Sequence, residues 1–239
     1  MRSGPAVRRR ARIGALAGPA GALLCLVLLP VQSKIWNEAD SPMLVRAVDP
    51  FVQELLGLQR EIAPGADAYM FFGRFFVAVY LLCLVGLWAF HHRRADRGGG
   101  DHVPRENRWV RVLAIALSIA AVADVGPYWG GLESPFAALF PLEMLALLAI
   151  MIGTLGYGIA LLRSGSAPRW LGWAFILAAP AALVVAWFSG YFPHGPMLPF
   201  TVAVALADVR GGSREPGLAQ DADGRVRTEN QSIWVSGER

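Results

Sequence analysis

The chain has 239 residues, of which 55% are hydrophobic and 17% are charged, and its formal net charge is +4. A soluble domain cannot bury so many apolar residues when they are arranged in long uninterrupted segments, so the composition argues against an ordinary soluble protein. The basic residues lie in the stretches between these segments, which argues against nucleic-acid binding.

Five apolar segments are each long enough to cross a lipid bilayer, which requires about 20 helical residues. A sixth apolar segment, 190–207, contains three prolines and predicts either a short span or a re-entrant half-helix. The sequence therefore predicts an all-α polytopic transmembrane bundle of six spans within residues 13–207. A basic N-terminus, 1–12, precedes it, and a polar tail, 208–239, is predicted to be disordered. The five long segments are 13–32, 71–90, 109–128, 135–162 and 169–188.

The first apolar segment has two interpretations. A basic stretch precedes it, and Val31-Gln32-Ser33 is compatible with cleavage, as in a secretory signal peptide. Its apolar part is longer than that of a typical signal, and Gly14 and Gly18 have the spacing that allows two helices to approach closely. We expect a retained span, with cleavage as the alternative.

Residues 33–69 form the predicted outer loop. Ser41-Pro42 and Asp49-Pro50 each place a capping residue before a proline, a typical start of a helix. Two short helices should follow, and the second is amphipathic. This second helix either caps the bundle or lies on the outer leaflet. We favour the cap because the loop is acidic and would not be attracted to anionic lipids.

The distribution of basic residues predicts the orientation of the chain. Of the 22 basic residues, 18 lie at the N-terminus, in the loops after the second and fourth segments, or in the tail. The positive-inside rule therefore places the N-terminus in the cytoplasm. The high arginine, alanine and glycine content is typical of a GC-rich bacterial genome, so we expect a plasma-membrane location.

Three ionisable residues fall within predicted spans: Arg74, Asp124 and Glu143. A charge in a span costs free energy and requires a partner or a function. With the N-terminus inside, all three lie in the outer half. Ala116, Ala120 and Asp124 recur every four residues, so Asp124 should face another helix. The three residues form either an outward-facing polar pocket or an ion pair that orients the helices.

Histidines and cysteines give weaker signals. His194, in the turn 191–196, could contribute to this cluster at the outer face, although a turn histidine is more often exposed. His91, His92 and His102 are expected in a solvated region, and Cys25 and Cys83 are expected to be small buried side chains. The sequence predicts no cofactor and no metal site.

Two stretches carry a resemblance to other proteins. Pro168-Arg169-Trp170-Leu171-Gly172-Trp173 and the later Gly190-Tyr191-Phe192-Pro193-His194-Gly195-Pro196 are similar to stretches of uncharacterised multi-pass membrane proteins of actinobacterial type. The resemblance covers the C-terminal half and implies no activity.

The sequence lacks the motifs GxSxG, HExxH, Walker A and CxxC, so an enzyme is not the favoured interpretation. We expect a non-enzymatic membrane protein that recognises a ligand or a partner at its outer face. Its partners would be the lipid bilayer and either another membrane protein or a second copy of the chain. One alternative is a small proton-linked carrier that uses Glu143. A weaker alternative is a transferase of lipid-linked substrates that uses Glu38 and Asp40.

Overall fold

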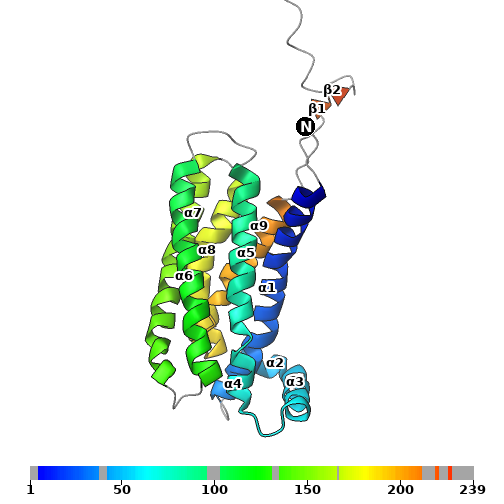
Figure 1. The fold of residues 1–239 in the computed structure, drawn as a ribbon, viewed down its shortest axis with the longest axis vertical. Helices are drawn as coiled ribbons and strands as arrows, with labels where there is room; N and C mark the ends of the chain where they lie inside the picture. Colours follow the sequence, from blue (N-terminus) through cyan, green and yellow to red (C-terminus); the bar gives the residue numbers. More distant parts are fainter. Residues whose placement is uncertain are drawn as a thin grey trace, which may run out of the picture.

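The computed structural model describes residues 5–37, 42–95, 103–130, 135–165, 167–211, 219–220 and 226–227. These residues are almost entirely helical, which confirms the predicted all-α bundle (Figure 1). The helices are α1 (Pro5–Asn37), α2 (Met43–Ala47), α3 (Asp49–Ile62), α4 (Ala68–Gly73), α5 (Phe76–Ala95), α6 (Val103–Gly130), the 3₁₀ helix η1 (Pro135–Leu139), α7 (Phe140–Ser164), α8 (Arg169–Ser189) and α9 (Met197–Gly211).

The predicted polar tail, 208–239, lies mostly outside the described residues. Helix α9 extends into its first residues and ends at Gly211. Beyond it, β1 (Ala219–Gln220) and β2 (Val226–Arg227) form a two-stranded antiparallel pair.

Five stretches of helix are long and apolar enough to cross a membrane. α4 and α5 together form the second of them, since only a short turn at Arg74 and Phe75 separates them. The chain is therefore a multi-pass integral membrane protein. The five stretches are Gly14–Asn37, Ala68–Arg94, Arg105–Gly130, Phe140–Ser164 and Arg169–Ser189.

The spanning helices form a closed ring in which each packs against its two neighbours. The order around the ring is α1, α5, α6, α7, α8 and α9, and α9 returns to α1 (Figure 1). We call the end of the bundle that carries Arg93, Arg105 and Arg163 the basic end. The opposite end carries α2 and α3 and is called the α3 end.

Helix α9 closes the ring. Its 15 residues span only about 22 Å, less than the other spanning helices. Near its C-terminus Asp208 reaches α1 and α5, because it contacts Gly18 and Arg93 at the basic end. Of the two predicted alternatives, a short sixth helix that runs between the ends of the bundle describes the structure better than a re-entrant segment.

The predicted close approach of α1 is present. A Cβ atom at Gly14 would lie 2.3 Å from Cβ of Ala89 on α5, so only glycine allows the two helices to pack at this distance. The first segment is thus a packed helix of the bundle. Whether part of it is cleaved stays a prediction.

The fourth span begins later than predicted. Residues 135–139 form the 3₁₀ helix η1, and α7 starts at Phe140 with Pro141 in its first turn. Proline favours the first turn of an α-helix, which explains the position of the start. Consequently Glu143 lies in the first turn of α7 and is not as deep in the span as the sequence suggested.

The two short helices of the predicted outer loop are present: α2 begins directly after Pro42, and α3 begins at Asp49 with Pro50 in its first turn. The predicted cap at Asp49 is wrong, since Val48 is the N-cap of α3 and Asp49 is already helical. α3 packs on the bundle through the buried side chains of Val52 and Gln59. Its residues Phe51, Leu58 and Ile62 remain exposed. α3 therefore caps the bundle along one edge and leaves an apolar face uncovered.

An ion pair fixes the start of α3 to α1. Lys34 Nζ lies 2.8 Å from Asp49 Oδ1, with both side chains partly exposed. The hydrogen bond from Lys34 lowers the pKa of the Asp49 carboxyl below its usual value. The contact thus depends on Asp49 being ionised.

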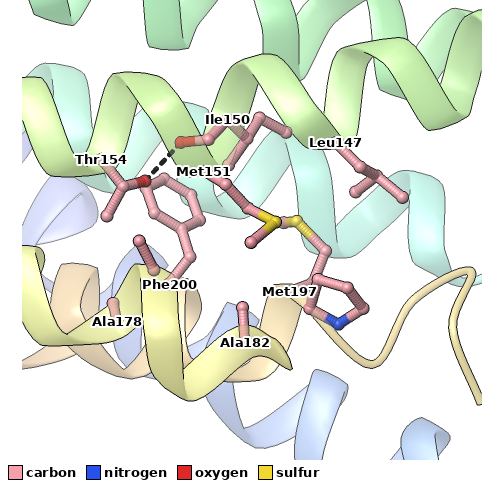
Figure 2. A pocket seen from close by; sticks show the side chains of 10 residues that line it. Leu147, Ile150, Met151, Thr154, Ala178, Ala182, Met197 and Phe200 are labelled. Atoms are coloured by element: carbon pink, nitrogen blue, oxygen red, sulfur yellow. Dashed lines mark hydrogen bonds between the residues drawn. The ribbon is translucent and has the colours of Figure 1, made fainter. Parts of the chain in front are cut away.

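The core between α7, α8 and α9 is nearly filled. Leu147, Ile150, Ala178, Met197 and Phe200 surround a space of about 10 Å³, and Figure 2 shows these side chains converging on it. A volume of this size corresponds to about one water molecule, and the lining is apolar except for Thr154, whose hydroxyl donates to the Ile150 carbonyl oxygen. We therefore regard this space as part of the packed core and not as a ligand site.

Candidate functional site

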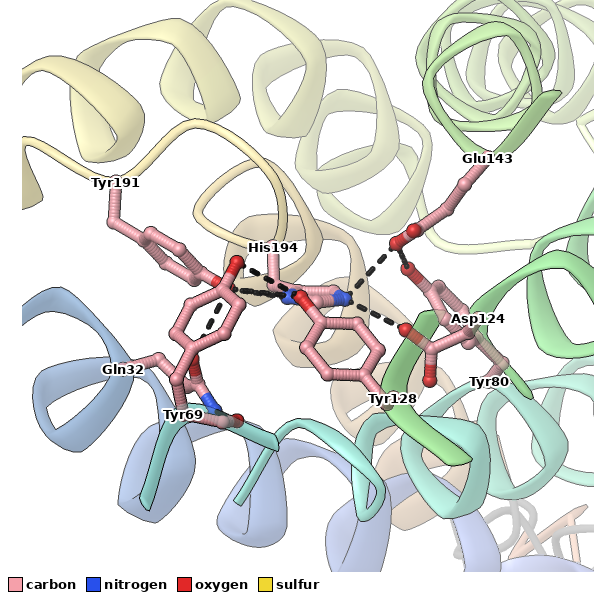
Figure 3. A network of polar contacts seen from close by, with 8 residues as sticks. All are labelled: Gln32, Tyr69, Tyr80, Asp124, Tyr128, Glu143, Tyr191 and His194. Carbon is pink, nitrogen blue, oxygen red and sulfur yellow. Dashed lines mark hydrogen bonds and ion pairs between the residues drawn. The ribbon is translucent and has the colours of Figure 1, made fainter. Parts of the chain in front are cut away.

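A histidine lies between two carboxylates (Figure 3). Asp124 lies near the end of α6 and Glu143 in the first turn of α7, which places the group in the half of the bundle next to the α3 end. His194 Nε2 is 3.1 Å from Asp124 Oδ1 and 2.9 Å from Glu143 Oε1. All three side chains are completely buried. We call Asp124, Glu143 and His194 the carboxylate–histidine cluster.

Two spanning helices position the carboxylates. Asp124 continues a buried row on α6 that includes Ala116 and Ala120, so its predicted orientation toward protein is confirmed. Glu143 lies in the first turn of α7, where the positive end of the helix dipole stabilises a negative charge. The two helices are antiparallel neighbours in the ring. Asp124 lies near the end of α6 and Glu143 near the start of α7, so the two carboxylates lie at the same depth in the bundle.

The turn between α8 and α9 carries His194 into the bundle. Gly190 ends α8 with a φ of +60°, a conformation that favours glycine. A Cβ atom at Gly195 would lie 2.3 Å from the Tyr191 carbonyl oxygen, so the turn can close only around a glycine. Pro193 and Pro196 are buried on either side of His194. The turn therefore folds inward, in contrast to the expectation that a histidine here would be exposed.

Further contacts fix the imidazole ring. It stacks on Phe76 of α5, with ring centroids 3.8 Å apart and an interplanar angle of 8°. Its Nδ1 atom lies 2.9 Å from the hydroxyl of Tyr191. Because Nδ1 is engaged by Tyr191, Nε2 is the nitrogen that faces the carboxylates.

Glu143 has a similar supporting contact. The Tyr80 hydroxyl donates a hydrogen bond of 3.1 Å to Glu143 Oε1. This is the same oxygen that faces His194. A hydrogen bond to a carboxylate oxygen holds the side chain in one orientation, so α5 contributes to the geometry of the cluster.

A group of tyrosines lies between the cluster and the α3 end. The hydroxyl of Tyr128 is 3.1 Å from that of Tyr69 and 3.4 Å from that of Tyr191 (Figure 3). Tyr191 also donates to Gln32 Oε1 at 3.3 Å. Since Tyr69 is only partly buried, these hydroxyls form a hydrogen-bonded path from His194 toward the edge of the bundle.

The charges of the cluster do not balance. Two carboxylates face one imidazole, and their ion pairs among the described residues are both with His194. The second oxygens, Asp124 Oδ2 and Glu143 Oε2, are buried and have no hydrogen-bond partner in the described part of the chain. Buried carboxylates without full compensation are costly, which indicates that the site takes up positive charge.

Arg74 does not supply this charge. Its Nε atom donates to the backbone oxygen of Tyr128 at 2.8 Å, and its guanidinium lies 5.4 Å from the ring centroid of Trp129. Its side chain is exposed. The structure thus brings together Asp124, Glu143 and His194 and leaves the predicted arginine at the surface of the bundle.

The other residues considered from the sequence lie elsewhere. Cys25 and Cys83 are buried free cysteines. His91 is buried near the basic end, with Nε2 2.5 Å from Asn107 Oδ1, so it is not simply solvated. His102 and the acidic residues of the transferase hypothesis, Glu38 and Asp40, lie outside the described residues.

The donor set suits a divalent transition-metal ion. One imidazole nitrogen and two carboxylate oxygens lie within 4.8 Å of one another. Nitrogen and oxygen donors of this kind bind Zn²⁺, Mn²⁺ and Fe²⁺. The contacts of Tyr191 to His194 and of Tyr80 to Glu143 are those that commonly orient metal ligands.

Sequence reasoning missed the tyrosines of the site. Tyr191 precedes His194 by three residues, a spacing that could have suggested a contact within the turn. Tyr80 and Tyr128 lie in apolar helices, where a tyrosine is usually assigned to the core or the interface. Their convergence depends on the order of the helices in the ring, which the sequence does not contain.

Comparisons with models of protein families, with curated proteins and with solved structures found no match. No relative therefore lends this chain an activity or a set of ligands.

Proposed function

We propose that this chain is an integral membrane protein that binds one divalent transition-metal ion, with Asp124, Glu143 and His194 as ligands. The observation that carries the proposal is the position of His194 Nε2, 3.1 Å and 2.9 Å from carboxylate oxygens of two fully buried acids. With a neutral imidazole, the two carboxylates carry a charge of −2. A divalent cation would neutralise it.

The distances are compatible with such an ion. In a tetrahedral site with bonds of about 2.1 Å, ligand atoms lie roughly 3.4 Å apart. The observed separations from Nε2 are slightly shorter, so an ion could enter after small outward movements of the side chains. Three protein ligands would leave one coordination position open for water or for a substrate group.

The ligand types limit the choice of ion. Ca²⁺ takes six to eight oxygen ligands, and Mg²⁺ keeps several waters in an octahedral shell. A buried set of one nitrogen and two carboxylates suits Zn²⁺ or Mn²⁺ better. Zn²⁺ is the most informative probe because it binds this donor set more tightly than Mn²⁺.

By the positive-inside rule the basic end of the bundle and the N-terminus would face the cytoplasm, and the composition of the chain favours the plasma membrane as the location. The carboxylate–histidine cluster would then lie in the outer half, and Tyr69, in the first turn of α4 and in contact with the hydroxyls of Tyr128 and Tyr191, would lie on the outer side of it. In this orientation the site would take its ion from outside. This is a specific form of the ligand recognition expected from the sequence.

The proposal is tested with the purified full chain in detergent. After removal of metals by a chelator, Zn²⁺, Mn²⁺ and Mg²⁺ are titrated by calorimetry. We expect one Zn²⁺ site per chain, and at least a hundredfold weaker binding for Glu143→Gln and His194→Gln. Glu54→Gln, which removes an exposed acid on α3, serves as the matched control and should bind like the wild type.

The same variants separate this proposal from the proton-linked carrier. If the wild-type chain binds no divalent ion, or if Glu143→Gln binds as tightly as the wild type, the metal proposal is wrong. A proton would then have to neutralise the surplus charge. Loss of a pH-driven solute flux in a well-folded Glu143→Gln variant would support the carrier, and reduced abundance alone would support a purely structural cluster.

A further inference from the structure

A cavity of about 220 Å³ opens at the basic end between α6 and α7. It is far along the helices from the carboxylate–histidine cluster, since Arg105 and Arg108 lie near the start of α6 and Arg163 lies in the last turn of α7. These three arginines line the cavity together with Trp109, Gly156 and Ile159. The cavity is therefore unrelated to the proposed metal site.

The charges of the cavity all have one sign. Arg105, Arg108 and Arg163 are exposed, and none of the described residues that line the cavity is acidic. The nearest acid in the sequence, Glu106, is buried and lies 3.1 Å from Arg94. Three guanidinium groups around one cavity favour phosphate oxygens, which arginine binds with paired hydrogen bonds.

The walls of the cavity are apolar. Trp109 packs flat against α7 at Gly156, where a Cβ atom would lie 2.5 Å from the indole ring. Ile159 lines the cavity, and Leu155 and Ile152 continue from it along the same exposed face of α7 toward the middle of the bundle. A phosphate bound by the arginines would thus lie at the end of an exposed apolar stripe on α7.

We propose that this cavity binds the phosphodiester headgroup of an anionic phospholipid of the inner leaflet. Basic pockets between transmembrane helices on the cytoplasmic side are suited to anionic headgroups, and each arginine adds favourable energy near the surface. The stripe of Ile159, Leu155 and Ile152 would receive an acyl chain. A free phosphate has no apolar part and would make no contact with this stripe.

The test counts lipids bound to the purified full chain by native mass spectrometry. Phosphatidylglycerol and phosphatidylcholine with the same acyl chains are added separately. We expect one tightly bound phosphatidylglycerol and no comparable binding of phosphatidylcholine. Arg108→Gln combined with Arg163→Gln should weaken phosphatidylglycerol binding by about tenfold or more.

The control is Arg111→Gln combined with Arg169→Gln, which removes the same charge from exposed arginines of the same end that do not line the cavity. It should change the affinity less than twofold. Equal losses in both double variants, or no preference for phosphatidylglycerol, would overturn the proposal. Displacement of the lipid by millimolar inorganic phosphate would identify a free phosphate as the ligand and would equally overturn it.

Discussion

Buried carboxylates have different charged partners in the two halves of the bundle. Near the basic end, the two buried carboxylates of the described residues each have a guanidinium partner: Asp208 Oδ1 lies 2.6 Å from Arg93, and Glu106 Oε2 lies 3.1 Å from Arg94. Near the α3 end, Asp124 and Glu143 share the single imidazole of His194. The buried carboxylates of one half are therefore balanced by neighbouring side chains, whereas those of the other half have an excess of negative charge.

We therefore interpret the carboxylate–guanidinium pairs near the basic end as structural contacts and the carboxylate–histidine cluster as the functional site. The pairs at the basic end join α5 to α9 and α5 to α6, and they need no further ion to be neutral. The carboxylate–histidine cluster joins α6, α7 and the turn before α9, but among the described residues its two carboxylates share one imidazole, so neutrality requires a further positive charge from a metal ion or a proton. Removal of one charge from a carboxylate–guanidinium pair should therefore lower the stability of the protein. Removal of one carboxylate charge from the carboxylate–histidine cluster should leave the stability unchanged or raise it.

The largest expected effect is at the basic end. Arg93→Met would leave Asp208, which is fully buried, without its guanidinium. An uncompensated buried charge costs about 3–5 kcal/mol, so the free energy of unfolding should fall by that amount. Denaturation in detergent measures it, with Arg111→Met as an exposed control expected to change stability by less than about 0.5 kcal/mol. A fall no larger than the control's would show that this pair is not a structural contact.

Glu143→Gln should give the opposite sign in the metal-free protein. The substitution removes one surplus charge, and the amide oxygen can still accept from Tyr80. We expect unchanged or higher stability, together with a loss of Zn²⁺ affinity of at least a hundredfold, which corresponds to about 2.7 kcal/mol. If the metal-free variant is instead destabilised as strongly as Arg93→Met, the two halves do not differ and the cluster is an ordinary structural ion group.

Tyr191→Phe should have a smaller effect on the same site. It removes the hydroxyl that lies 2.9 Å from His194 Nδ1 and leaves the ring in place. Loss of such a supporting contact typically lowers metal affinity by about 10–100-fold. Tyr157→Phe, at a buried tyrosine of α7 that packs on Phe175, is the matched control and should bind Zn²⁺ normally. Equal affinities for the two variants would show that Tyr191 does not support a metal ligand.

The smallest effect concerns the contact between α1 and α3. The hydrogen bond from Lys34 lowers the pKa of Asp49, so the stabilisation is present above the ordinary carboxyl pKa and is lost as the pH falls through the lowered value. The protection of the α3 amides, measured as the hydrogen-exchange rate relative to the intrinsic rate at each pH, should fall slightly on acidification through that range. In Lys34→Gln this loss of protection should be absent; if it persists, another group controls the docking of α3.

Much of this architecture could be predicted from the sequence. Apolar length predicted the five long helices, and the Ser-Pro and Asp-Pro pairs predicted the starts of α2 and α3. The four-residue spacing of Ala116, Ala120 and Asp124 correctly predicted that the aspartate faces protein. These features depend on local sequence or on one face of a single helix.

The composition of the site could not be predicted in the same way. His194 is buried because the turn 190–196 folds inward to meet the short helix α9, and this follows from the closure of the ring. Arg74 was expected near the carboxylates because it lies at a similar depth, but depth does not fix direction, and its guanidinium turns to the backbone of Tyr128. The burial of His194 and the direction of the Arg74 side chain both depend on contacts between segments that are distant in the sequence.

The X-ray absorption spectrum of the Zn²⁺-loaded full chain tests directly whether Asp124, Glu143 and His194 bind the ion. We expect a first shell of nitrogen and oxygen at about 2.0–2.2 Å, with the outer-shell signal of a single imidazole that disappears in His194→Gln. A sulfur shell at about 2.3 Å, which would implicate Cys25 or Cys83, would contradict it, as would an imidazole signal that survives the removal of His194.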